Sequence, residues 1–409
     1  MRGGRLNEAL ERLADYPFAR LATLLSAATP PAGVPPLAMS VGEPQHAPPA
    51  FLAEILAAHA GSWNRYPPVG GTPEFREACA AWLQRRFSLP AGMVDPAHIL
   101  PVSGTREALF LVAELVVDHQ RPGANQVPAV ALPDPFYAPY EGAAVMAGAE
   151  PVFLPAGPAT GFLPDLDALA ADAALLARLR LLYLCTPTNP QGAVASRDYL
   201  DRAIGLARTH GFVLVADECY AEIYDREPPV GVLEVAAARD GRSLDNILVF
   251  HSLSKRSNAA GLRSGFVAGD PGLIAAFSRL RSHSAAGMPL PIQAASAALW
   301  ADDAHVAANR DLYRAKFDAA EAALAGRFGF RRPEGGFFLW LDVGDGEAAA
   351  RRLWAEAGIR TLPGAYITRL PQPEIGRRWL RVALVHDTET VARASALLGD
   401  VLSRAEAAE

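Results

Sequence analysis

The sequence contains very little lysine. Of its 38 lysines and arginines, only Lys255 and Lys316 are lysines, so arginine supplies nearly every cation. The difference matters because an amine can lose its proton and attack a carbonyl, whereas a guanidinium in a protein stays charged. Lys255, in the stretch "FHSLSKRSNAAGLRSGF", is therefore a candidate nucleophile. Lys316 has charged neighbours on a predicted helix, and we expect it to be a solvated surface residue.

Cysteine, long apolar runs and excess positive charge are also scarce. Cys79, Cys185 and Cys219 are far apart and lack CxxC spacing, which argues against a disulfide framework or a zinc site and indicates a reducing compartment. No apolar run is long enough for a membrane span, and the first residues lack the apolar core of a signal peptide. A net charge of -6 argues against electrostatic binding of nucleic acid. We therefore expect a cytoplasmic protein without nucleic-acid or membrane partners and without a metal.

The middle of the chain alternates apolar runs with amphipathic segments. The runs are nearly continuous in Val, Leu, Ile and Phe, which is typical of strands buried on both faces of a mostly parallel sheet. Helix signals lie between them, such as Ser196 before and Gly211 after a predicted helix. The alternation predicts an α/β fold with helices on both faces of the sheet. The predicted strands cover residues 127–135, 179–187, 211–218, 246–254 and 262–270.

The chain is long enough for two domains. We predict a large domain of residues 46–290 and a smaller α/β domain that combines residues 1–45 with 291–409. Ligands of open α/β sheets bind at the carboxyl ends of the strands. Polar residues gather at those ends, namely Asp217 and Tyr220 in "ADECY", Asn189 in "CTPTNPQG", and Ser252 and Arg263 on either side of Lys255.

Two further turns carry glycine or aromatic residues. In "SGTREALF", Gly104, Thr105 and Arg106 begin a predicted helix, where free backbone N–H groups favour an anion. In "DPFYAPY", Tyr137 follows a predicted strand and could stack on a flat ring. Taken singly, each feature has a simpler explanation: Asp217 as a helix cap, Asn189 as a turn former, the glycine turn as an ordinary helix start.

Together these groups suit pyridoxal 5'-phosphate. A lysine amine forms a Schiff base with its aldehyde, and a carboxylate keeps its pyridine nitrogen protonated so that the ring accepts electrons. A phenol and an amide can hydrogen-bond the 3'-oxygen of the ring, while arginine, serine and helix N–H groups hold the phosphate.

The order of "SGTREA", "DPFYAPY", "TPTNPQG", "ADECY" and "SLSKRSNAAGLRSGF" resembles that of the fold-type-I aminotransferases of class I and II, over nearly the whole chain. The resemblance implies an aspartate aminotransferase-like fold and transamination between amino-acid and oxo-acid substrates. It implies that Lys255 binds the cofactor aldehyde, that Asp217 pairs with the pyridine nitrogen, and that Tyr137 stacks on the ring. Asn189 and Tyr220 would contact the 3'-oxygen, and the phosphate would be held by Ser252, Arg263, Gly104, Thr105 and Arg106.

The same resemblance extends to the substrate pocket. Arg381 in "WLRVALV" matches the arginine that binds the substrate α-carboxylate, and Gly42 and Asn189 match residues of that pocket. Tyr66 matches a tyrosine that reaches the cofactor phosphate of the neighbouring subunit, which implies a homodimer with shared active sites.

Within the family, "GTREALF", "PFYAPYEGAA" and "ECYAEIY" resemble the succinyldiaminopimelate aminotransferases of lysine and diaminopimelate biosynthesis. This implies glutamate as donor and N-succinyl-2-amino-6-oxopimelate as acceptor, with Arg106, Arg256, Arg281 and His283 as candidates for the distal group. The alternatives are an aspartate, aromatic or LL-diaminopimelate aminotransferase, or a carbon–sulfur β-lyase that uses the same lysine and aspartate. A transcription regulator is disfavoured, because only about forty residues precede "SVGEP".

Overall fold

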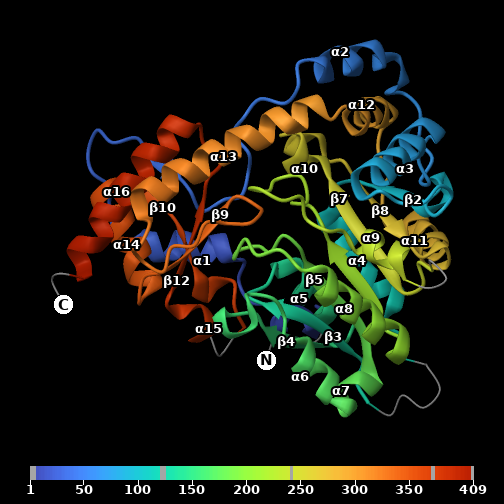
Figure 1. Cartoon of the computed structure of the whole chain (residues 1–409), viewed down its shortest axis with the longest axis horizontal. Helices are drawn as coiled ribbons and strands as arrows, with labels where there is room; N and C mark the ends of the chain where they lie inside the picture. Colours follow the sequence, from blue (N-terminus) through green and yellow to red (C-terminus); the bar gives the residue numbers. More distant parts are fainter. Residues whose placement is uncertain (1–5, 120–125, 240–242, 370–373, 407–409) are drawn as a thin grey trace.

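A seven-stranded sheet forms the centre of the larger lobe (Figure 1). The computed structural model describes residues 6–119, 126–239, 243–369 and 374–406. The strand order is β2-β8-β7-β6-β5-β3-β4, and all neighbours are parallel except that β8 runs antiparallel to β2 and β7. The predicted mostly parallel sheet is thus confirmed. The strands are β2 (Ile99–Val102), β3 (Ala129–Asp134), β4 (Glu150–Pro155), β5 (Leu179–Cys185), β6 (Val213–Asp217), β7 (Ile247–Ser252) and β8 (Gly265–Gly269).

Helices cover both faces of this sheet. Successive side chains of a strand point to opposite faces, so Leu182 and Leu214 join one hydrophobic cluster while Tyr183 and Val215 join the other. The first cluster includes residues of α3 (Pro73–Phe87), α6 (Leu166–Ala171), α7 (Ala173–Arg178), α8 (Arg197–His210), α9 (Val232–Ala238) and α12 (Leu290–Ala301). The second includes residues of α4 (Thr105–Val116), α5 (Ala138–Met146) and α11 (Pro271–Ser284).

The helix boundaries follow the local signals in the sequence. The Ser196 hydroxyl accepts a hydrogen bond from the Tyr199 N–H at the start of α8, and Gly211 ends that helix at a φ of +71°. At the start of α3, Thr72 accepts the Phe75 N–H in the same way. These capping residues fix where α3 and α8 begin and where α8 ends.

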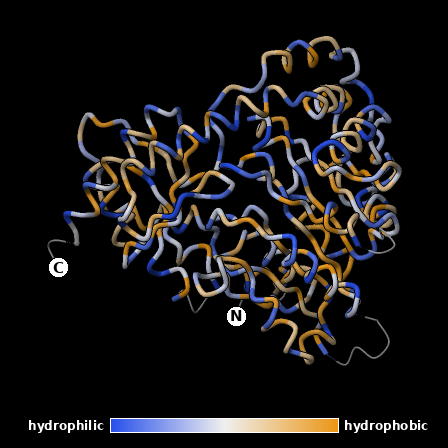
Figure 2. The backbone as a smooth tube through the Cα atoms, in the orientation of Figure 1, coloured by the Kyte–Doolittle hydropathy of each residue, from blue (hydrophilic) through white to orange (hydrophobic). Residues whose placement is uncertain are grey.

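The smaller lobe combines the two ends of the chain. Its three-stranded antiparallel sheet has the order β11-β12-β9, and β1 pairs in parallel with β10 (Figure 1). Figure 2 shows apolar chain inside both lobes. The predicted domain boundaries at residues 45 and 290 stay a prediction. The elements are α1 (Pro17–Leu25), β1 (Leu37–Ala38), α13 (Ala304–Leu324), β9 (Phe338–Asp342), α14 (Gly346–Ala357), β10 (Ile359–Arg360), β11 (Leu362–Pro363), α15 (Glu374–Arg377), β12 (Trp379–Ala383) and α16 (Thr388–Glu406); α2 (Phe51–Ala58) packs on α12.

Lys316 lies inside this smaller lobe, so the expectation of a solvated residue is wrong. Its side chain is buried, and Nζ donates a hydrogen bond to the Leu384 carbonyl at 3.0 Å and lies 4.1 Å from the centre of the Tyr313 ring. Burial lowers the pKa of Lys316 to about 7. The charged neighbours in sequence, Arg314 and Asp318, lie on the outer part of α13, where they form ion pairs. Helical periodicity separates the two faces.

Candidate active site

A cavity of about 540 Å³ opens at the carboxyl ends of the central strands, between the two lobes. Most of the residues predicted from the sequence line it, although they come from segments far apart in the chain. The motifs thus meet at one edge of the sheet, at the carboxyl ends of its strands. The predicted residues in its lining are Gly42, Thr105, Arg106, Tyr137, Asn189, Asp217, Tyr220, Ser252, Lys255, Arg263 and Arg381.

Lys255 projects from the short helix α10 (Leu253–Arg256), which begins where β7 ends. Ser252 caps this helix, because its hydroxyl accepts the Ser254 N–H at 3.1 Å. The Lys255 Nζ donates a hydrogen bond to the Gly42 carbonyl. Burial lowers the pKa of Lys255 from 10.5 to about 8. A much larger fraction of the amine is therefore neutral near pH 7 than in a solvated lysine.

Asp217 is a buried carboxylate at the end of β6. It accepts a hydrogen bond from the Tyr140 hydroxyl at 2.6 Å and another from the Cys219 N–H at 3.2 Å. Burial raises the pKa of Tyr140, which keeps this phenol a proton donor. The contact was not predicted, since Tyr220 is closer in sequence. The stretch "DPFYAPY" did carry a signal for this contact, because Tyr137 and Tyr140 are one helical turn apart and both can therefore face the same side.

The start of α4 forms an anion-binding corner. Gly104 caps the helix with a φ of +83°, and a Cβ at this position would collide with the guanidinium of Arg263. Only glycine therefore lets Arg263 lie across the helix N-terminus. Free N–H groups, a guanidinium and the nearby Ser252 hydroxyl, which also lines the cavity, suit a phosphate.

Arg381 lies on the opposite side of the cavity, on β12. Its two Nη atoms donate hydrogen bonds to Asn189 Oδ1 at 3.0 Å and to the Ser40 carbonyl at 2.7 Å, and its Cζ is 4.4 Å from the centre of the Phe338 ring. Its buried Nε has no hydrogen-bond partner among the residues that the structure describes. Burial lowers the pKa of Arg381 to about 10, so it remains charged at neutral pH. A buried cation with an unused donor fits a carboxylate.

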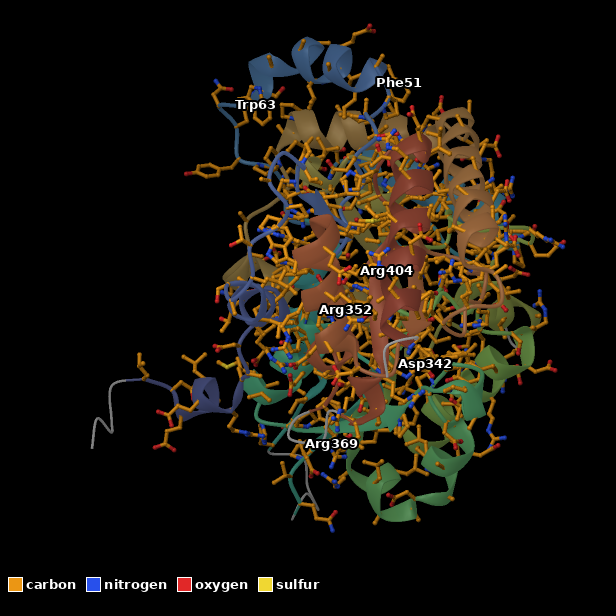
Figure 3. All side chains as sticks on the ribbon, turned by 90° about the vertical axis from the view of Figure 1, so that its left-hand side faces the viewer. Phe51, Trp63, Asp342, Arg352, Arg369 and Arg404 are labelled. Carbon is orange, nitrogen blue, oxygen red and sulfur yellow. The ribbon has the colours of Figure 1, made fainter. Side chains whose placement is uncertain are left out.

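Some predicted residues lie outside the cavity. Tyr66 is fully exposed. Its neighbour in sequence Trp63, which is more than half exposed, is labelled in Figure 3 on the segment that follows α2. Arg256 is buried and donates to the Leu299 carbonyl and to Asp303. Arg281 is likewise buried, with the Pro101 carbonyl and Glu107 as partners, and the exposed His283 is not part of the lining. Of the four candidates for the distal group, only Arg106 reaches the cavity.

Several lining residues were not predicted. Tyr16, Pro17 and Phe18 reach the cavity from the start of α1, and Glu43 from the segment after β1. Pro17 signalled a helix start. Nothing local showed that this helix would pack against α14 and β11, which lie more than 300 residues later in the chain.

Comparison with known proteins identifies the family. Residues 35–398 match the model of the class I and II aminotransferases. The chain belongs to this family. Its cofactor is accordingly pyridoxal 5'-phosphate, and the donor set fits this group: a lysine with a lowered pKa, a buried carboxylate, and an anion-binding helix start with Arg263 beside it. Within the described residues, no helix is long and apolar enough to cross a membrane.

The aminotransferase shares similarity with proteins of differing specificity. The transaminase OxyQ of Streptomyces rimosus, named for 4-dedimethylamino-4-oxo-anhydrotetracycline, is 38% identical over 88% of this chain and 92% of its own length. An LL-diaminopimelate aminotransferase of Desulforudis audaxviator is 32% identical over 97% of each chain. A crystal structure of an aminotransferase from Neisseria meningitidis is 39% identical, with a TM-score of 0.90 over 98% of this chain and all of its own. All three proteins are aminotransferases, in agreement with the family of this chain, and the two named substrates differ.

Proposed function

We propose that this aminotransferase moves the amino group of glutamate to N-succinyl-2-amino-6-oxopimelate. The observation that carries the acidic substrate class is the cavity lining, where Arg106, Arg263 and Arg381 have no carboxylate partner among the described residues. A cofactor phosphate and a substrate α-carboxylate account for two of these cations. The resemblance also implied a phosphate contact for Arg106, but its Nε donates a hydrogen bond to the Tyr137 hydroxyl. This third cation favours a substrate with another acidic group, which both proposed substrates carry.

The residues of the chain take complementary roles. Arg381 binds and orients the α-carboxylate with its unused Nε donor. Lys255 would hold the cofactor through its aldehyde, and the Lys255 Nζ would act as the general base that accepts the α-proton of the substrate. When bound, the cofactor supplies an electron-accepting ring, and Asp217 keeps the nitrogen of that ring protonated. The Tyr140 hydroxyl holds the Asp217 carboxylate in place.

The enzyme is further proposed to be a cytoplasmic homodimer with Tyr66 at the cofactor phosphate of the partner. This proposal is supported by the exposure of Tyr66 and Trp63, two large aromatic side chains that lie close together in sequence and outside the cavity of their own chain. Exposed aromatic side chains of this size are typical of an interface. The free and separated cysteines suit a reducing compartment.

Two other acceptors have support from relatives. LL-diaminopimelate aminotransferases match nearly the full chain, and OxyQ is named for a polycyclic ketone. A substrate panel separates the succinyl compound from LL-diaminopimelate. Purified enzyme would be mixed with glutamate, aspartate, cysteine, LL-diaminopimelate and N-succinyl-LL-diaminopimelate, one at a time, while the absorbance of the lysine-bound cofactor is recorded.

Loss of that absorbance with both glutamate and the succinyl compound supports the proposal. If the absorbance is lost with glutamate and LL-diaminopimelate but not with the succinyl compound, the acceptor is the oxo form of diaminopimelate and not its succinyl derivative. Pyruvate and sulfide formed from cysteine would instead indicate a β-lyase. The Lys255→Ala variant is the control, because it should show no lysine-bound absorbance with any compound.

A further inference from the structure

The buried carboxyl group of Asp134 takes no part in the roles described above. Asp134 is the last residue of β3, and its side chain is fully buried. Its Oδ1 accepts a hydrogen bond from the Arg369 backbone N–H at 3.2 Å, whereas Oδ2 has no hydrogen-bond partner among the residues that the structure describes. A buried carboxylate oxygen without a partner lowers stability, so its presence at this position calls for an explanation.

The hydrogen bond from Arg369 joins the two lobes. Asp134 lies in the larger lobe, and Arg369 lies in the smaller lobe, after the 3-10 helix η7 (Gly364–Tyr366). A second hydrogen bond runs from the Phe136 N–H to the Ile367 carbonyl at 2.8 Å. These two hydrogen bonds form what we call the lobe junction.

Both sides of the lobe junction reach the catalytic cavity. Phe136 and Tyr137 line this cavity from the larger lobe, and Ile367 lines it from the smaller lobe. The described lining does not include Asp134 itself. Separation at the lobe junction would move Ile367 away from Tyr137, and it would therefore widen this part of the cavity wall.

The surroundings of Asp134 disfavour its charged form. Burial raises the pKa of Asp134 to about 6, and the Arg369 N–H and the Arg369 side-chain charge offset only part of this effect. Glu141 on α5 is a second carboxyl group nearby, and its pKa is raised by burial and by Asp134. At neutral pH Asp134 is therefore charged in a place that favours its neutral form.

The cost of this charge falls on the lobe junction. If the junction separates, water reaches the Asp134 carboxylate and its pKa returns toward the ordinary value of about 3.9. Because the joined form then binds a proton more tightly than the separated form, ionisation of Asp134 favours separation. An asparagine would offer the Arg369 N–H an acceptor without this charge. The carboxylate thus makes the lobe junction easier to open.

We propose that Asp134 is a positioning residue whose charge weakens the lobe junction, so that the cavity wall at Ile367 opens for the exchange of substrate and product. The hydrogen bond from Phe136 keeps the two segments in register while the junction is joined. Asp134 acts through the position of Ile367 and not by contact with substrate or cofactor. The inference is independent of which amino acceptor the enzyme uses.

Hydrogen exchange tests this directly, by comparing the native enzyme with Asp134→Asn, both with cofactor bound. The readout is deuterium uptake by a peptide that covers residues 366–369, and both proteins are measured at each pH so that the intrinsic exchange rate cancels. Between pH 5 and pH 7.5 the exchange rate of the native segment, divided by that of the variant, should rise up to about tenfold. This ratio follows from a pKa of about 6 in the joined form and about 3.9 in the separated form.

Steady-state kinetics provide a second readout, with the amino donor that the substrate panel identifies. Relative to the native enzyme, Asp134→Asn should have a lower kcat and a lower KM at pH 7.5, each by about three- to tenfold. A junction that stays joined retains the substrate and also delays release of the product. Both differences should shrink at pH 5, where the native Asp134 is mostly neutral.

Glu141→Gln is the matched control, because it removes a nearby half-buried carboxyl group that is not part of the lobe junction. Its exchange rate, kcat and KM should stay within about twofold of the native values at both pH 5 and pH 7.5. The inference is overturned if the ratio of native to Asp134→Asn exchange does not change with pH. A ratio that falls as pH rises would also overturn it, since the charge would then hold the junction together. The same applies if Glu141→Gln reproduces the change seen with Asp134→Asn.

Discussion

The lowered pKa of Lys255 makes cofactor capture depend on pH in a specific way. Burial lowers this pKa from 10.5 to about 8. At pH 7 about 10% of the amine is then neutral, against about 0.03% for a solvated lysine, a difference of about 300-fold. Since only the neutral amine attacks an aldehyde, the capture rate should rise about tenfold per pH unit below 8 and level off above it.

The assay mixes cofactor-free enzyme with pyridoxal 5'-phosphate between pH 6 and 10 and follows the absorbance of the lysine-bound form. Two variants should move the break, which is the pH at which the capture rate stops rising, in opposite directions. The Glu43 carboxylate raises the pKa of Lys255 and the Arg106 guanidinium lowers it, so Glu43→Gln should shift the break to lower pH and Arg106→Gln to higher pH. Lys316→Met should leave it in place, since Lys316 lies in the smaller lobe. A rate that climbs without a break through pH 9.5 would refute the reasoning.

The remaining predictions concern three residues with different roles. Arg381→Gln should slow the half-reaction with every amino acid by about 100-fold while the cofactor stays bound, and unchanged kinetics would contradict its α-carboxylate role. Tyr66→Phe should weaken cofactor retention in ultrafiltration about tenfold, since it loses one hydrogen bond to a charged group, and a fully active monomer in sedimentation would rule out the cross-subunit contact. For Lys316, the folded pKa of about 7 lies below the unfolded value of 10.5, so between these values the unfolded chain binds more protons and stability rises with pH. Relative to Lys316→Met, the free energy of unfolding of the native protein in urea should rise by up to about 1.4 kcal/mol per pH unit in that window; parallel curves would show that Lys316 does not titrate there.

Local sequence determined the larger lobe and the identity of most site residues. Continuous apolar runs produced β5, β6 and β7, and capping residues such as Ser196 and Gly211 ended the helices between them. The carboxyl ends of parallel strands lie at one edge, so the order of strands and polar residues along the chain is enough to bring Asp217 and Lys255 to the same edge. Their chemistry could be deduced because each residue type has few possible roles beside a cofactor.

Packing between distant segments decided the rest. Arg256 and Arg281 are as basic as Arg106 in the sequence, yet the fold turns both into the interior, where backbone carbonyls and a carboxylate accept hydrogen bonds from their Nη atoms. The charged neighbours of Lys316 predict a surface residue, but one turn of α13 carries both a buried and an exposed face. The hydrogen bond from Tyr140 to Asp217 joins residues 77 positions apart. Local pattern determines which face of an element is apolar, whereas the direction in which a long polar side chain points depends on which element packs against it, and only the tertiary structure settles that.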